Sequence, residues 1–83
     1  MMSPIAAHEE VMAVKWLGGI FPEVVGMLPF QALQWLILEN HCRWILAPSE
    51  VTGTQTACWD GIISYGETTL LALESAIQEW VKK

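Results

Sequence analysis

Hydrophobic and polar positions predict three helical segments in the N-terminal half of the chain. Ser3 suits a helix cap, and the spacing predicts a helix from Pro4 to about Leu17 that ends at Gly18-Gly19. The apolar positions expected to share one face of this helix are Ile5, Met12 and Trp16.

Two prolines mark the next helix starts. Pro22, followed by an acidic residue, predicts a short helix that ends at Gly26. Pro29 then begins a stronger helix that is expected to run to about Asn40. The apolar positions expected on one face of the stronger helix are Phe30, Leu33 and Ile37.

From Cys42 onward the pattern alternates, which is typical of strands. The first strand is expected to end at Pro48, and the polar stretch 49–56 to form a hairpin loop. A second strand is predicted from Ala57 to Tyr65, with a bulge or close approach at Gly61. The residues expected on one face of it are Ala57, Trp59, Ile63 and Tyr65.

The last element is a helix capped by Thr68, with an apolar seam at spacings of three and four. Its seam residues are Leu70, Leu73, Ile77 and Trp80. The predicted fold is therefore a single α+β domain over residues 1–83: helix, short helix, helix, two-stranded antiparallel hairpin and C-terminal helix. A lone hairpin is marginally stable and leaves open edges, which favours a homodimer.

The segment Val11–Leu38 is unusually apolar, since 19 of its 28 residues are apolar and Lys15 and Glu23 are its only charges. The chain has 83 residues, of which 53% are apolar. Small domains bury only about 60–65% of their unfolded surface, so the core of this chain is too small to bury all of its apolar side chains. We therefore expect another protein or a second copy to cover it. A small membrane-associated protein is the alternative, but Glu23 and the interrupting prolines and glycines count against a bilayer span.

The charge balance and the cysteine content limit the class of partner and the cellular compartment that we expect. Nine acidic residues against four basic ones give a net charge of −5 and no basic stripe, which argues against nucleic-acid binding. The two cysteines are too few for a disulfide scaffold, and the N-terminus lacks the basic region of a signal peptide. A cytoplasmic location without a cofactor is the expectation.

Candidate chemistry is sparse. His8, His41, Cys42 and Cys58 lack the spacing of a zinc site, so no metal is expected. A disulfide between Cys42 and Cys58 across the hairpin is disfavoured by a reducing compartment. A cysteine-dependent enzyme using Cys58 with His41 and Asp60 is a further alternative. Because no motif fixes that geometry, the chain is not expected to be an enzyme.

Aromatic residues give the most specific prediction of a site. Trp16 and Trp80 fall on helix seams and are expected in the core. Exposed tryptophans are enriched at binding hot spots. The function predicted is a small protein-binding module of inhibitor or adaptor type, and its predicted partner-binding residues are Phe21, Met27, Trp35, Trp44, Trp59 and Asp60.

The segment from Trp59 onward contains Gly66-Glu67-Thr68, followed by Ala72-Leu73 and Ala76-Ile77. This order resembles the strand–G-[DE]-T–helix segment of HicB-type antitoxins and the ending of short prophage-encoded accessory proteins. The resemblance covers about 25 residues and implies a phage-like accessory role. The helical N-terminal half departs from the strands that begin HicB proteins, so no functional residue is carried over.

Overall fold

The computed structural model describes residues 4–39, 44–47 and 54–82. The predicted α+β class is confirmed, with helices first, then an antiparallel hairpin, then a C-terminal helix. The predicted cap at Ser3 and the predicted stop at Asn40 lie outside the described residues. The elements in chain order are α1 (Pro4–Leu17), the 3-10 helix η1 (Pro22–Val24), α2 (Pro29–Glu39), β1 (Trp44–Ala47), β2 (Gln55–Trp59), β3 (Ile62–Gly66) and α3 (Thr69–Val81).

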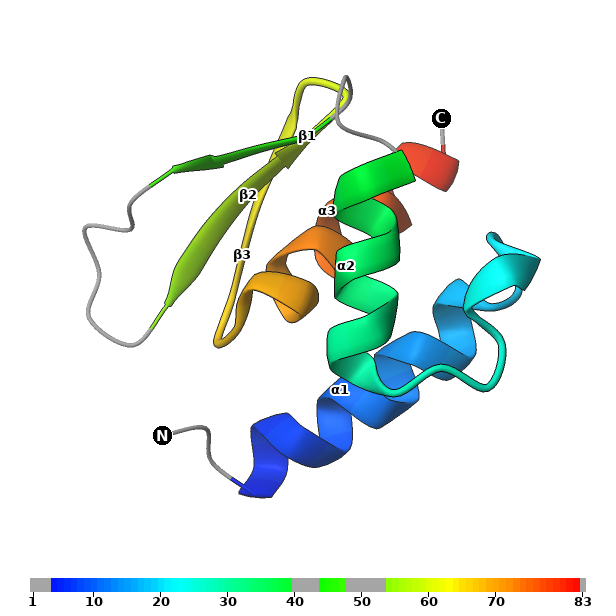
Figure 1. The fold of residues 1–83 in the computed structure, drawn as a ribbon. Coiled ribbons are helices and arrows are strands. Elements are labelled where there is room, and N and C mark those ends of the chain that lie inside the picture. Colours follow the sequence, from blue (N-terminus) through cyan, green and yellow to red (C-terminus); the bar gives the residue numbers. More distant parts are fainter. Residues whose placement is uncertain (1–3, 40–43, 48–53, 83) are drawn as a thin grey trace.

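The helices gather on one side of the sheet (Figure 1). Helix α3 packs against β2 and β3, and α1 and α2 pack against α3 and against each other. Helix α3 is therefore the element that joins the sheet to the N-terminal helices. The opposite face of the sheet is covered by no helix of the described chain.

The sheet has three strands in the order β1-β2-β3, one more than predicted. The prediction of a single strand from Ala57 to Tyr65 is wrong, because Asp60 and Gly61 both have positive φ, 50° and 85°. Two such residues in succession are what a type I′ hairpin turn requires, and Asp-Gly is a favoured pair for it. The chain therefore turns back at Asp60-Gly61, and the pairing is antiparallel throughout.

Because of this turn, the residues after it lie on the opposite sheet faces from those that one continuous strand would give them. Trp59 pairs with Ile62 and Cys58 with Ile63, and paired residues lie on the same face. Ile62 accordingly packs against the core, whereas Ile63 and Tyr65 are 63% and 62% exposed. The prediction that Ile63 and Tyr65 share a face with Trp59 is therefore wrong.

The predicted seam of α3 is confirmed, since Leu70, Leu73 and Ile77 are fully buried. Thr68 caps the helix as predicted: its Oγ1 accepts a hydrogen bond from the backbone N–H of Leu71, with an N···O distance of 3.2 Å. This satisfies one of the backbone donors that every helix start leaves without an intrahelical partner.

The predicted faces of α1 and α2 are wrong in part: Trp16 and Leu33 pack against the core as predicted, but three other large residues do not. Ile5, Met12 and Phe30 are exposed, while alanines close to them in the chain are buried. Ala6 and Ala13 of α1 instead form a small buried cluster with Leu71 of α3. A side chain as small as alanine lets two helices approach closely, and a pattern based on large apolar residues does not detect it. The residues buried on α1 and α2 are Ala6, Ala13, Val14, Leu17, Ala32 and Leu36.

Candidate functional site

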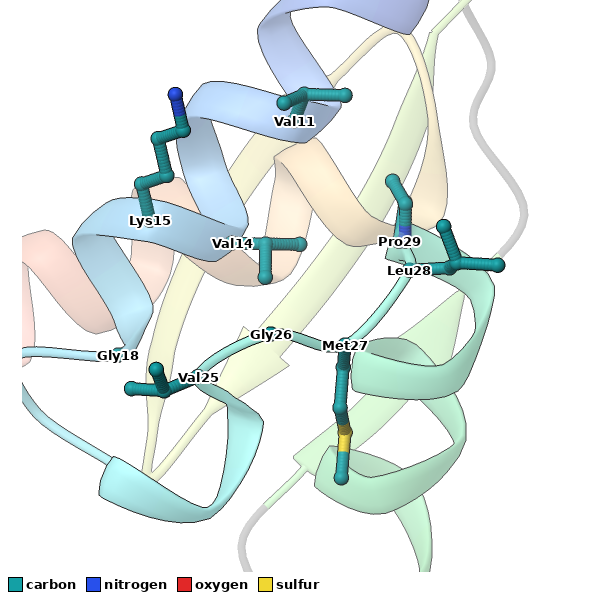
Figure 2. A pocket seen from close by; sticks show the side chains of 9 residues that line it. All are labelled: Val11, Val14, Lys15, Gly18, Val25, Gly26, Met27, Leu28 and Pro29. Carbon is teal, nitrogen blue, oxygen red and sulfur yellow. The ribbon is translucent and has the colours of Figure 1, made fainter.

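An apolar groove lies between α1 and the segment that connects η1 to α2 (Figure 2). Its volume is about 360 Å³. Helix α1 supplies Val11, Val14 and Lys15 to one wall, and Val25, Met27 and Leu28 come from the connecting segment. Gly18, Gly26 and Pro29 complete the lining. We call this the α1–α2 groove.

Local backbone conformation holds the connecting segment in place. Gly26 has a φ of 82°, a left-handed conformation that glycine adopts without strain. The next helix start is fixed by Gln31, whose Oε1 accepts a hydrogen bond from the backbone N–H of Leu28 at 2.9 Å. A side chain three residues into a helix that reaches back to the cap is half of a capping box. The segment that faces α1 is thus set by a turn at one end and a cap at the other.

The rim of the groove exposes large apolar side chains. Val25 is 69% exposed and Leu28 is 57% exposed, and Val11 is also exposed on the α1 side. Lys15 is the one charged residue of the lining, and it forms no ion pair with any other described residue. An apolar, concave surface with a single cation is typical of a site for an apolar partner segment.

Three of the predicted partner-binding residues lie in or against the core. Trp59 is fully buried, so the prediction that it lies on a binding surface is wrong. Phe21 packs between it and Trp35, with ring centroids 6.1 Å and 5.5 Å away respectively. Trp80 also contacts Trp59, with ring centroids 5.9 Å apart. The four rings therefore form a series of contacts from Trp35 through Phe21 and Trp59 to Trp80, and edge-on and tilted contacts of this kind add to apolar burial.

The other predicted residues have three different outcomes. Met27 lines the α1–α2 groove and belongs to the predicted apolar segment Val11–Leu38. Asp60 is exposed at the hairpin turn, where its Oδ2 accepts a hydrogen bond from Nε1 of Trp80 at 3.1 Å. The side chain of Trp44 lies outside the described residues, although its backbone pairs with Trp59 in the sheet. Of the predicted residues whose side chains the structure describes, Met27 is the one that lines the groove.

The six predicted partner-binding residues include neither Val11 nor Lys15, which α1 contributes to the groove, although both fall in the apolar segment Val11–Leu38. The sequence pattern instead assigned the large residues Ile5 and Met12 to the apolar face of α1. The available signal was Gly18, which leaves room for the connecting segment: a Cβ there would lie 2.9 Å from Cγ2 of Val25. A glycine at a helix end is usually interpreted only as a stop signal, so this second role was not recognised.

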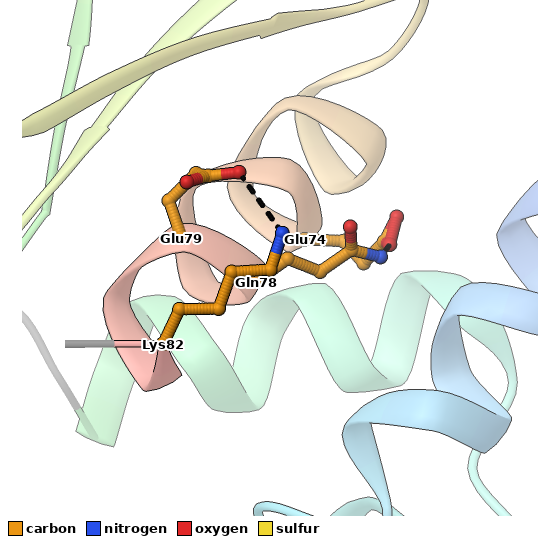
Figure 3. A network of polar contacts seen from close by, with 4 residues as sticks. All are labelled: Glu74, Gln78, Glu79 and Lys82. Atoms are coloured by element: carbon orange, nitrogen blue, oxygen red, sulfur yellow. Dashed lines mark hydrogen bonds and ion pairs between the residues drawn. The ribbon is translucent and has the colours of Figure 1, made fainter.

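A second, more polar hollow of about 560 Å³ lies between α1, the end of β3 and α3. Glu9 and Glu74 face it from the two helices. Burial raises the pKa of Glu74, an effect that the hydrogen bond from Gln78 opposes and the charge of Glu9 reinforces. Figure 3 shows Glu74 and Gln78 beside the ion pair of Lys82 with Glu79, whose Nζ···Oε1 distance is 3.4 Å.

The residues of the cysteine-enzyme alternative are only partly described. Cys58 is a free, half-buried thiol, and its register partner Ile63 lies on the face away from α3. Asp60 instead contacts Trp80 on α3. His41 and Cys42 lie outside the described residues, so neither the alternative catalytic trio nor the disfavoured disulfide falls within the described structure. Within the described residues, no three metal-ligating side chains gather.

None of the helices in the described ranges combines the length and apolar character needed to cross a membrane. Comparison with protein-family models, with curated proteins and with solved structures finds no match to this chain.

Proposed function

We propose that this protein is a binding module of inhibitor or adaptor type that receives an apolar segment of another protein in the α1–α2 groove. The observation that carries the proposal is the exposure of Val25 and Leu28 on the rim of a concave apolar surface. Large apolar side chains gathered around a hollow mark interaction sites more often than large apolar side chains scattered singly.

An amphipathic helix is the partner segment that fits best. A groove between a helix and an adjacent segment takes apolar side chains that recur at every third or fourth position of a helical partner. Lys15 lines the groove and forms no ion pair with another described residue. An acidic residue beside the apolar stripe of the partner would therefore form an ion pair with it. On a chain of net charge −5 this cation sets the groove apart from the surrounding surface.

The expected contribution of one groove residue follows from burial. Covering an exposed leucine side chain contributes about 1.5–3 kcal/mol, and each 1.4 kcal/mol changes a dissociation constant about tenfold. Replacing Leu28 by glutamate removes this contribution and adds the cost of desolvating a carboxylate. We expect Leu28→Glu to weaken binding at least tenfold.

Selection from a displayed library of helical peptides tests the proposal. The unmodified protein is the bait, and enriched peptides are then measured against Val25→Glu, Leu28→Glu and Leu38→Glu. Leu38 is 72% exposed on α2 and does not line the groove, so Leu38→Glu repeats the chemical change elsewhere. Enriched peptides should combine an apolar stripe with acidic residues, bind the Leu38→Glu variant normally and lose binding to the two groove variants. Peptides that bind all three variants equally well would refute the proposed site.

A further inference from the structure

Strand β3 has one unpaired side. The order β1-β2-β3 places it at an edge of the sheet, and no described strand pairs with its outer side. The two-residue turn makes Trp59 and Ile62 a narrow hydrogen-bonded pair, and such pairs recur at every second residue. The backbone N–H and C=O groups of Ile63 and Tyr65 therefore point away from β2. Neither residue forms a backbone hydrogen bond to another described segment.

Several protections that natural edge strands carry are absent from β3. Natural edge strands carry lysine, proline, a bulge or an inward charge that blocks pairing with another chain. The sequence Ile62-Ile63-Ser64-Tyr65-Gly66 contains no charge and no proline, and it pairs with β2 in unbroken register. Ile63 and Tyr65 are exposed, and their pairing with Cys58 and Thr56 places them on the opposite face from Trp59. Tyr65 also borders the hollow between α1 and α3. Both the backbone and the side chains of this edge are thus available to another strand.

We propose that two copies of the chain pair through β3, antiparallel about a two-fold axis at Ser64. The pattern is self-complementary: in this register Ile63 lies opposite the partner's Tyr65, and Tyr65 lies opposite the partner's Ile63. The outward backbone groups of these residues then exchange four hydrogen bonds. An aromatic residue opposite a β-branched one is a favourable cross-strand pair. The result is one continuous six-stranded sheet.

The same register keeps the flanking carboxylates from facing each other directly. Asp60 and Glu67, the acids that border β3, fall opposite the partner's Thr68 and the partner's Gly61 respectively. The two copies still repel through their net charges of −5 each. Salt screens this repulsion over about 8–10 Å, so added salt should increase the fraction of dimer.

The proposal uses a surface separate from the α1–α2 groove and does not depend on the function proposed for it. A pair of five-residue strands is small beside the roughly 1,200–2,000 Å² that stable complexes bury. We therefore expect a reversible dimer with a dissociation constant in about the micromolar range, so that both states are observable in one concentration series.

Sedimentation equilibrium of the full chain tests the pairing. The average mass should rise from 9.3 kDa at low concentration toward twice that value, and at a given concentration it should rise with salt. Ile63→Lys should shift the midpoint to at least tenfold higher concentration, because lysine at an edge opposes strand addition. Leu38→Lys introduces the same charge on an exposed residue of α2 and should leave the midpoint unchanged. Circular dichroism checks that both variants are folded.

Cross-linking tests the position of the axis. Residues opposite each other in a non-hydrogen-bonded antiparallel pair have Cα atoms about 4.5 Å apart, within the range of a disulfide. In a background in which both native cysteines are serine, Ser64→Cys should form a disulfide dimer under mild oxidation, and Gln55→Cys, at the far end of β2, should not. A mass that stays at 9.3 kDa over the whole series overturns the proposal. A dimer that Leu28→Glu dissociates and Ile63→Lys does not would also overturn it, because the groove would then be the interface.

Discussion

Replacing Gly66 by alanine tests how tightly β3 is packed against the start of α3. Gly66 is the last residue of β3, and it lies against the first turns of α3. A Cβ added there would lie 2.5 Å from the backbone N of Ala72 and 2.8 Å from the backbone C of Leu71. Both neighbours are backbone atoms, so no side-chain rotation relieves the overlap. Either the strand end or the helix must move.

The size of the effect follows from two opposing contributions. Overpacking of a tight site costs about 1–3 kcal/mol, and a backbone clash places Gly66→Ala near the upper limit. Alanine also restricts the unfolded chain, which restores about 0.4–1 kcal/mol. The net loss is about 2 kcal/mol, against a total stability of about 4–12 kcal/mol for a chain of this length. At about 4–8 °C per kcal/mol, the melting temperature should fall by about 8–16 °C.

Gly61→Ala is the matched control. Gly61 has positive φ, but an added Cβ would have open space around it, so only the backbone conformation is penalised. That penalty is about 1–2 kcal/mol, and the restriction of the unfolded chain again restores part of it. Urea unfolding of both variants, followed by far-ultraviolet circular dichroism, should rank Gly66→Ala as the less stable. Equal stabilities, or Gly66→Ala as the more stable, would show that β3 and α3 are not in the close contact described.

Three further substitutions test other contacts. Burial and the charge of Glu9 raise the pKa of Glu74 above its ordinary value of 4.5. Between the pKa of this carboxyl in the unfolded chain and its higher pKa in the folded chain, the folded state retains a proton that the unfolded state has lost. The free energy of unfolding therefore falls as pH rises through this interval. Glu74→Gln should therefore unfold at a higher temperature than the unmodified protein at pH 7 and at the same temperature well below pH 4.5; a lower temperature at pH 7 contradicts this. Thr68→Ala removes the cap of α3 and the 2.8 Å hydrogen bond to Glu10, and should cost about 1–2 kcal/mol by urea unfolding. Trp59→Ala should cost about 3–5 kcal/mol, whereas a tryptophan on a surface would leave the unfolding midpoint nearly unchanged.

The sequence predicted the bounds and order of the helices well because their ends carry local signals. Pro4 and Pro29 begin α1 and α2, and Thr68 caps α3. These signals act within one turn of the chain, so they are readable without knowledge of the fold. The seam of α3 was also predicted, since its large apolar residues Leu70, Leu73 and Ile77 are fully buried.

The hairpin turn was missed although its signal is local. Asp60-Gly61 is a favoured pair for a two-residue turn, but the apolar residues on both sides alternate as one long strand would. The interpretation of Gly61 as a bulge preserved that alternation. A two-residue turn reverses which sheet face each following side chain occupies. The prediction therefore placed Ile63 and Tyr65 on the wrong face and did not identify β3 as a separate edge strand.

The candidate groove could be predicted only in part, because its position depends on which residues of α1 are buried. Ala6 and Ala13 are buried against Leu71, and this close contact rotates Met12 outward and directs Val11 and Lys15 toward the connecting segment. No property of a single alanine in a sequence indicates that a helix will approach it closely. The connecting segment falls within the apolar segment Val11–Leu38 that was predicted to be covered by a partner, and Met27 of this segment lines the groove.

The high apolar content of this chain is explained by which apolar residues are buried and which are exposed. Much of the core consists of alanine, while several large side chains lie outside it. Hydrophobic burial scales with area, so an alanine-rich contact between helices contributes less per residue than a leucine-rich one and leaves apolar area for other use. Within the described residues this area lies at the α1–α2 groove and on exposed side chains of α1, α2, β3 and α3, namely Ile5, Met12, Phe30, Leu38, Ile63, Tyr65 and Val81. A chain that gains stability from close packing of small residues thereby keeps its larger apolar side chains available for association.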